Sequence, residues 1–163
     1  MTTTAEKAGR KAIVTTPSDR EIRFERIFDA PRERVWRACT EPKLLAQWWA
    51  RGNQMDVERY ELKTGGHWRV VEHTPQGSFG FEGRFGEITP GERVVQTFEW
   101  DGMPAHPCRE TMEYIDLGDG RTKLVGTSIF FTQQERDGML QHGMEGGMNQ
   151  SHAALDALLE RIG

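Results

Sequence analysis

The chain has 163 residues, of which 36% are hydrophobic and 28% are charged, and its formal net charge is −4. This length and composition are typical of one soluble domain that buries roughly 70% of its unfolded surface. The acidic balance provides no basic field for a phosphate backbone or an anionic lipid surface, which argues against nucleic acid and membrane partners.

The N-terminal segment and the cysteines indicate the number of domains and the cellular location of the chain. Residues 1–19 are Thr-rich and lack the apolar core of a signal peptide, so we expect a loose tail before a single domain at residues 20–163. Cys39 and Cys108 lie far apart in sequence and form no metal-spaced or redox pair. Reduced thiols and a cytoplasmic location are therefore expected.

The first predicted elements are one strand and two short helices. Residues 20–28 alternate in polarity, which favours a strand. Pro31 suits the first turn of a helix that ends near Thr40. Pro42 opens a second short helix, which the Arg51-Gly52-Asn53 sequence breaks.

Six further strands are predicted, separated by turn sequences that contain Gly, Pro, Asp and Thr. They span residues 55–62, 67–73, 79–88, 93–100, 109–117 and 122–131. Short turns between consecutive strands indicate an antiparallel meander, and the first strand brings the total to seven. The predicted class is α+β.

A long helix is predicted between Gln133 and Ile162, because apolar residues recur there at helical spacing. Its first half contains four glycines, each destabilising a helix interior by roughly 1 kcal/mol relative to Ala. They are Gly138, Gly143, Gly146 and Gly147. Three explanations for these glycines are open: another backbone passes close by, a ligand cavity lies beneath flexible Met side chains, or the helix is broken.

Several landmarks of the sequence resemble one known family when they are taken together. They are Phe28-Asp29-Ala30-Pro31, Thr40-Glu41-Pro42, Trp48-Trp49, Gly65-Gly66-His67-Trp68-Arg69, Glu87-Ile88-Thr89-Pro90, residues 93–100 and Gly143-Met144-Glu145-Gly146-Gly147. In order and spacing they resemble the SRPBCC (START-like) superfamily, in the branch named after the activator of the heat-shock-protein-90 ATPase.

The resemblance implies a helix-grip fold, in which a curved seven-stranded antiparallel sheet wraps around a long C-terminal helix and encloses an apolar cavity. Relatives use this cavity for lipids, hormones, polyketides or other hydrophobic molecules. Met148 departs from the pattern, since many relatives carry Trp there. The co-chaperone that names the branch has an additional N-terminal domain with no counterpart here, which argues against a chaperone partner.

Aromatic and sulfur-containing side chains provide the best candidate for a binding site. Those suited to line an apolar pocket are Trp48, Trp49, Trp68, Phe79, Phe81, Phe85, Phe98, Trp100, Met112, Met144 and Met148. From this set we predict as ligand-binding residues Trp48, Trp68, Phe85, Trp100, Met112, Met144 and Met148. Residues 101–107, which follow Trp100, form either an entrance lid or a plain connector.

Metal, cofactor and nucleophile chemistry is not indicated. The five histidines lack metal-ligand spacing, and no Gly-x-Ser-x-Gly sequence is present. Acid–base candidates occur in strands whose alternate side chains can face a cavity: His67, Arg69, Glu82, Arg84, Glu99, Glu110 and Glu113. Such alternating charges more often mark the solvent face of a half-buried sheet.

The sequence therefore favours binding of a small hydrophobic or amphipathic molecule between the sheet and the C-terminal helix, with no cofactor and no metal. One alternative is a cyclase, dehydratase or hydrolase, which a buried carboxylate or histidine of shifted pKa beside the cavity would favour. Another is a chaperone adaptor or a homodimer, which a filled interior and an exposed apolar patch would favour.

Overall fold

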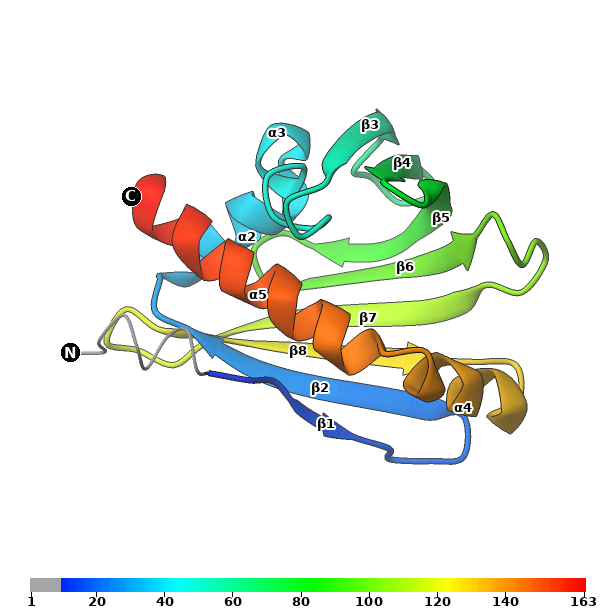
Figure 1. Ribbon diagram of the computed structural model, residues 1–163. Coiled ribbons are helices and arrows are strands. Elements are labelled where there is room, and N and C mark those ends of the chain that lie inside the picture. The colour runs from blue at the N-terminus through cyan, green and yellow to red at the C-terminus, as the bar shows by residue number, and fades with distance from the viewer. Residues whose placement is uncertain (1–9) are drawn as a thin grey trace.

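The computed structural model describes residues 10–163 as one antiparallel sheet crossed by a long helix (Figure 1). The strands are β1 Ile13–Thr15, β2 Glu21–Phe28, β3 Gln54–Tyr60, β4 His67–Thr74, β5 Gly77–Thr89, β6 Arg93–Trp100, β7 Cys108–Asp116 and β8 Thr122–Ile129. The helices are α2 Arg32–Thr40, α3 Pro42–Leu45, α4 Gln133–Gln141 and α5 Met144–Arg161. The first nine residues, part of the predicted tail, lie outside the described residues.

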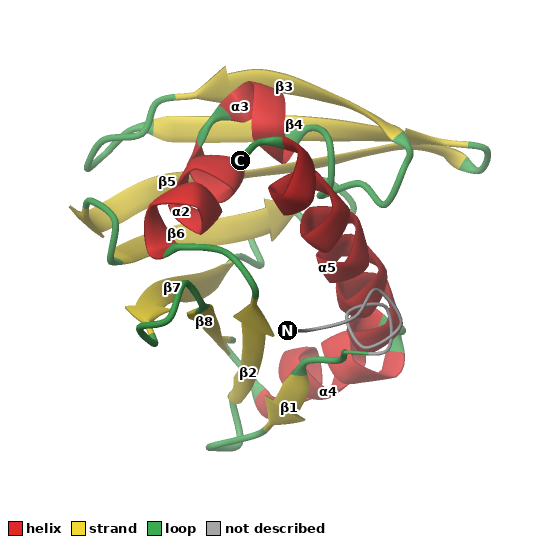
Figure 2. Ribbon diagram, turned by 90° about the vertical axis from the view of Figure 1, so that its left-hand side faces the viewer, coloured by secondary structure: helices red, strands yellow, loops and turns green. Residues whose placement is uncertain are grey.

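The strands follow the order β1-β2-β8-β7-β6-β5-β4-β3, and all neighbours are antiparallel. Strands β3 to β8 form the predicted meander, while β2 pairs with β8. Figure 2 shows the sheet curving from β3 to β1, with α5 on its concave side. The predicted α+β class and helix-grip arrangement are confirmed.

The sheet has eight strands, whereas the sequence predicted seven. The additional strand, β1, lies within the segment predicted as a tail, and its central residue Val14 pairs with Phe24 of β2. Neighbouring Ala12 is only 7% exposed. A strand of three residues is too short to produce a recognisable alternation of polar and apolar residues, which explains why it was missed.

The predicted single helix at residues 133–162 is in fact two helices, α4 and α5. Gly143 separates them with a φ of 76°, in the left-handed region that favours glycine. At the start of α4, the Thr132 side chain accepts a hydrogen bond from the Glu135 backbone N–H at 3.1 Å. A broken helix is therefore the correct explanation for Gly143.

The most tightly packed core lies where the C-terminal half of α5 meets α2 and the sheet. Its members include Phe28, Val35, Leu124, Leu155 and Leu158, each with at most 2% of its surface exposed. Beside this core, Arg26 of β2 donates to Asp156 of α5, with 2.6 Å between Nη2 and Oδ2. This buried ion pair fixes the C-terminal half of α5 against β2, because leaving either charge unpaired in the interior is strongly unfavourable.

Candidate functional site

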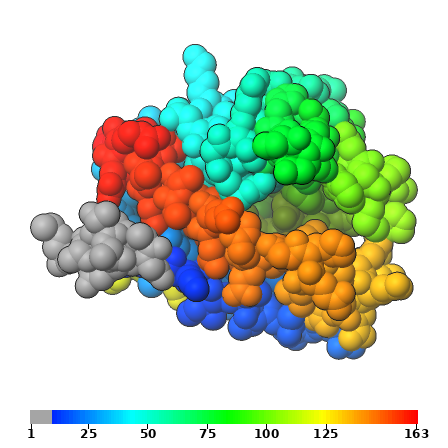
Figure 3. All heavy atoms as spheres, in the orientation of Figure 1, coloured from blue at the N-terminus to red at the C-terminus, as the bar shows by residue number. Residues whose placement is uncertain are grey.

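A cavity of about 1670 Å³ lies between the concave face of the sheet and the helical segment formed by α4 and the start of α5. In the space-filling view, a hollow is visible between the orange helical segment and the green strands (Figure 3). Binding pockets for drug-sized molecules are typically about 300–1,000 Å³. The cavity is therefore large enough for a lipid-like or polycyclic molecule.

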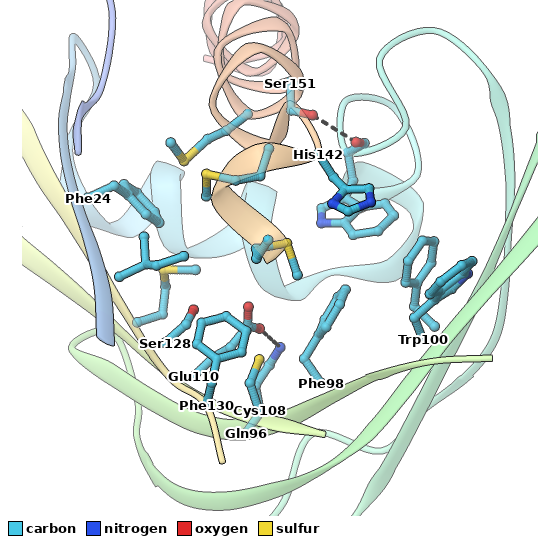
Figure 4. A pocket seen from close by; sticks show the side chains of 18 of the residues that line it. Phe24, Gln96, Phe98, Trp100, Cys108, Glu110, Ser128, Phe130, His142 and Ser151 are labelled. Atoms are coloured by element: carbon cyan, nitrogen blue, oxygen red, sulfur yellow. Dashed lines mark hydrogen bonds between the residues drawn. The ribbon is translucent and has the colours of Figure 1, made fainter. Parts of the chain in front are cut away.

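Three adjacent strands each place one polar residue at the same level of the cavity wall. Gln96 of β6 is the register partner of Glu110 of β7, and Glu110 is the partner of Ser128 of β8. Partners in adjacent strands share one face of a sheet, and all three residues line the cavity. We call Gln96, Glu110 and Ser128 the polar row; Figure 4 shows them grouped on the sheet side of the pocket.

Apolar side chains border the polar row on both sides. One flank consists of Val94, Met112, Gly126 and Phe24, and the other of Phe98, Cys108 and Phe130. A Cβ atom on Gly126 would lie 2.2 Å from Cε1 of Phe24, so a glycine is needed for the aromatic ring to lie over β8. The cavity wall is thus an apolar surface interrupted by one polar line.

Glu110 is the electrostatically unusual member of the polar row. Burial raises its pKa to about 7, against the opposing effect of a hydrogen bond from Gln96. Gln96 Nε2 donates to Glu110 Oε1 at 3.1 Å. Within residues 10–163, no Lys, Arg or His side chain forms an ion pair with Glu110. This carboxyl group can therefore hold or release a proton near neutral pH.

The helical wall of the cavity contains methionines and glycines. Met139, Met144 and Met148 line it, together with Gly138 and Gly147. A Cβ atom added to either glycine would meet no other heavy atom within 4 Å. The close approach of a second backbone is therefore excluded at both positions, and the open space expected of a cavity is found instead.

His152 contributes a buried imidazole on the α5 side. The ring lies between Phe24 and Phe28, with centroid distances of 5.4 and 5.3 Å. Burial, assisted by the charge of Arg26, lowers its pKa to about 3, so the ring is neutral at physiological pH. Nδ1 of His152 is buried and has no hydrogen-bond partner among the described residues.

Six of the seven predicted ligand-binding residues line the cavity: Trp48, Trp68, Trp100, Met112, Met144 and Met148. Phe85 does not line it. Its side chain is 3% exposed and packs against Tyr60 with 5.4 Å between ring centroids. Phe85 of β5 is the register partner of Gln96, but its side chain lies in a filled cluster, so local packing separates it from the cavity. Contact between the six residues and a ligand remains a prediction.

Among the charged strand residues considered for acid–base chemistry, only Glu110 lines the cavity. Those that do not are His67, Arg69, Glu82, Arg84, Glu99 and Glu113. Arg69, for example, forms ion pairs with Glu58, Glu82 and Asp101 at 3.0, 3.3 and 2.7 Å. Interactions of this kind are typical of the outer face of a sheet.

The thiols are poor nucleophiles. Burial raises the pKa of Cys39 to about 12 and also raises the pKa of Cys108, and both are free cysteines. A thiolate is the reactive form, so neither side chain is activated for nucleophilic attack. In the part of the chain that the structure describes, no group of three or more His, Cys, Asp or Glu side chains is placed to hold a metal ion.

The loop at residues 101–107 borders the cavity. Met103 and His106 belong to the lining, and Nδ1 of His106 is hydrogen-bonded to Oε1 of Glu135 on α4. Trp100 and Met103 are 38% and 47% exposed. The contact between His106 and Glu135 therefore joins the loop to the helical wall; an entrance-lid role remains a prediction.

Two members of the polar row, Gln96 and Ser128, were not predicted from the sequence. Each lies two residues before an aromatic residue of the cavity wall, Phe98 and Phe130. Because residues two apart in a strand share a face, this spacing was the available signal. Using this signal required knowing which alternate residues of each strand face the cavity, and the aromatic residues alone did not determine that.

Comparison with known proteins defines the family. Residues 29–160 match the family model described as activator of Hsp90 ATPase homolog 1-like protein. The chain belongs to this family. The resemblance found in the sequence is thereby confirmed, and the match includes α2, the polar row and most of α5. A search of the curated proteins gives no match.

Solved structures of similar proteins support the same assignment. A Rhodobacter sphaeroides protein is 27% identical, with a TM-score of 0.85, 94% of this chain covered and 100% of that chain. A Chromobacterium violaceum protein is 28% identical, with a TM-score of 0.74 and coverages of 86% and 98%. An Arthrobacter aurescens protein at 22% identity, with a TM-score of 0.82 and 91% of each chain covered, shares the fold.

Proposed function

We propose that the protein binds one small hydrophobic or amphipathic molecule in the cavity between the sheet and the segment formed by α4 and α5. The supporting observation is the cavity itself, about 1670 Å³ in volume, with apolar flanks on both sides of the polar row. Removing apolar ligand surface from water provides roughly 25 cal/mol per Å². Family membership adds support, since this fold typically accommodates hydrophobic ligands.

The residues proposed to contact the ligand come from both walls. The sheet provides Trp68, Trp100 and Met112, the turn that follows α3 provides Trp48, and α5 provides Met144 and Met148. Methionine side chains adapt their shape at little energetic expense, which suits a wall that closes over an irregular apolar molecule. The structure adds Phe24, Phe98 and Phe130 to these candidates.

Native mass spectrometry of freshly purified protein, followed by solvent extraction, tests this proposal. We expect an apolar molecule bound at about one per chain, or saturable one-to-one binding of the neutral fluorophore N-phenyl-1-naphthylamine if the natural ligand is lost during purification. Absence of both a co-purifying molecule and saturable fluorophore binding would contradict the proposal. The same mass spectrum reports whether the protein forms a homodimer, as the alternative of an interaction module would require.

A second candidate function is acid–base catalysis on the bound molecule, as in a cyclase, dehydratase or hydrolase. The observation that favours it is Glu110, because a carboxyl group whose pKa is about 7 suits proton transfer at neutral pH. Gln96 and Ser128, beside it in the polar row, are placed to orient a substrate carbonyl or hydroxyl group. This chemistry requires no metal and no thiolate.

Turnover distinguishes the two functions. The extracted molecule should be returned unchanged by a binding protein, whereas an enzyme should convert it, and Glu110→Gln should stop conversion while the complex still forms. Glu113→Gln is the matched control, since Glu113 lies on the same strand outside the cavity lining. Conversion that survives in Glu110→Gln would exclude Glu110 as the acid or base.

A role as an interaction module has less support. Such a role was expected with a filled interior, but the interior here contains the cavity, and two of the exposed apolar side chains, Trp100 and Met103, border it. No helix within residues 10–163 has the length and hydropathy needed to cross a bilayer. We therefore propose a small molecule rather than a chaperone as the partner.

A further inference from the structure

We propose that the ligand is a lipophilic amine, whose protonated nitrogen is held by the polar row and whose hydrocarbon body lies against the flanking aromatic and Met side chains. This inference rests on the proposed binding function and specifies the ligand class. Three observations carry it: an unsatisfied carboxylate, a matching set of acceptors and the distribution of charge around the cavity.

Glu110 has one oxygen atom available to a ligand. Its Oε1 accepts the hydrogen bond from Gln96 Nε2 at 3.1 Å, and among residues 10–163 no donor is hydrogen-bonded to its Oε2. A carboxylate in an apolar wall is unfavourable unless it is paired and hydrogen-bonded. A ligand ammonium group would supply both the opposite charge and the missing donor.

The polar row presents the number of acceptors that a primary ammonium group requires. An –NH₃⁺ group has three N–H donors and no acceptor. The hydrogen bond to Glu110 assigns the Gln96 amide so that its carbonyl oxygen is left as an acceptor. Together with Glu110 Oε2 and the Ser128 hydroxyl oxygen, this makes three acceptors on three adjacent strands.

The charges that line the cavity favour a cation over an anion. Among the described lining residues Arg51 is the only Lys or Arg, and its guanidinium group is already 2.5 Å from the buried carboxylate of Glu72. The lining carboxylates of Glu135 and Asp137 contact His106 and Arg136, respectively, which leaves Glu110 without a cation. A fatty acid would therefore meet a carboxylate and no free arginine or lysine among the described lining residues.

The position of the polar row also sets the shape of the ligand. Figure 4 shows Glu110 and Ser128 near Phe130 and Cys108 on the sheet side, with Ser151 on the opposite side of the pocket. Because apolar flanks extend on both sides of the row, the nitrogen lies against the middle of the wall and hydrocarbon is accommodated in both directions. The apolar flanks bury the hydrocarbon of the ligand, and the polar row selects its nitrogen.

The test compares three probes that share one ten-carbon tail: decylamine, decanol and decanoic acid. Each is titrated at pH 8, below its solubility limit or micelle concentration, against protein carrying N-phenyl-1-naphthylamine. We expect decylamine to displace the fluorophore about tenfold more tightly than decanol, the difference typical of a hydrogen bond to a charged group. Decanoate should bind most weakly.

Two matched variants assign the preference to the polar row. Glu110→Gln retains the side-chain volume and should lower decylamine affinity about tenfold while changing fluorophore and decanol affinity less than about twofold. Glu113→Gln removes the same charge from the same strand, outside the cavity lining, and should leave all three affinities unchanged. Ser128→Ala should lower decylamine affinity by a smaller factor.

Each alternative outcome has a separate meaning. Equal or tighter binding of decanol or decanoate to the wild-type protein would overturn the amine assignment while leaving the binding function in place. An equal loss of decylamine affinity in Glu110→Gln and Glu113→Gln would attribute the preference to net charge and would also overturn it. Failure of the fluorophore itself to bind would instead remove the binding function, and the amine assignment with it.

Discussion

The C-terminal half of α5 is packed and its N-terminal half borders open space, although both halves face the same curved sheet. Leu155 and Leu158 are 0% exposed, in a core shared with α2 and the sheet. Met144, Gly147 and Met148 instead line the cavity. A single helix thus provides a packed core at one end and a cavity wall at the other, which implies that the cavity can be altered without loss of the fold.

The chemistry of the side chains explains the difference between the two halves. Leucines interdigitate at native packing density, and the ion pair between Arg26 and Asp156 fixes that half against β2. The other half begins at the Gly143 break and has methionines, which have three flexible bonds. The packed C-terminal half of α5 thus holds its N-terminal half over the polar row.

Truncation of matching residues in the two halves is expected to give the largest contrast. Leu155→Ala should lower the free energy of unfolding by about 3 kcal/mol, because it opens a cavity in a filled core. Met148→Ala should lower it by less than about 1 kcal/mol, because the adjoining space is already open. Urea unfolding of both variants measures the contrast, and equal losses would show that the two halves are packed alike.

The fold was largely predictable because its signals are local. Alternation and turn residues placed seven strands within a few residues of their observed bounds, and apolar spacing indicated the terminal helical region. The break between α4 and α5 could not be predicted from the sequence, because Gly143 is compatible with a continuous helix until its φ is known. Strand β1 was missed because it has only three residues.

The cavity was only partly predictable because its polar row depends on register. Hydrophobicity identified most of the apolar lining, but Gln96, Glu110 and Ser128 are separated by more than ten residues in sequence and meet only through strand pairing. Phe85 was predicted as a ligand-binding residue because the sheet was expected to face the C-terminal helix at that point. Its ring packs against Tyr60 in a filled cluster, and the sequence pattern does not encode which apolar residues border the cavity.

The stability of the protein should depend on pH through the open region, because Glu110 lines the cavity and is destabilising when ionised. Its pKa in the folded protein is about 7, above the value of 4.5 for an unperturbed glutamate. The folded state therefore binds more protons than the unfolded state between these values, and stability falls as the pH rises through that window. The loss should be at most about 3 kcal/mol by pH 8.

Glu110→Gln should remove this loss. The variant should be more stable than the wild-type protein at pH 8, again by at most about 3 kcal/mol, and similar to it at pH 4. Chemical denaturation across the pH series measures the difference, with Glu113→Gln as the reference for a charge lost outside the cavity. A wild-type profile that rises from pH 5 to pH 8 relative to Glu110→Gln would contradict the raised pKa.

Filling the open half of the helix gives the smallest expected change in free energy and the most direct test of its role. Met144→Trp places a larger ring in the cavity and should weaken binding of N-phenyl-1-naphthylamine at least about tenfold. Stability should change by less than about 1 kcal/mol, since overpacking is costly only where space is already filled. Glu145→Trp adds the same ring to the exposed side of α5 and should bind the fluorophore normally.

The two measurements on Met144→Trp separate a cavity from an ordinary core. If the variant loses several kcal/mol of stability, the position is packed like Leu155 and the contrast between the two halves of α5 disappears. If stability and binding are both retained, the fluorophore lies elsewhere and the helical wall is not part of its site. Loss of binding with retained stability is the combination that only an open cavity beneath the N-terminal half of α5 produces.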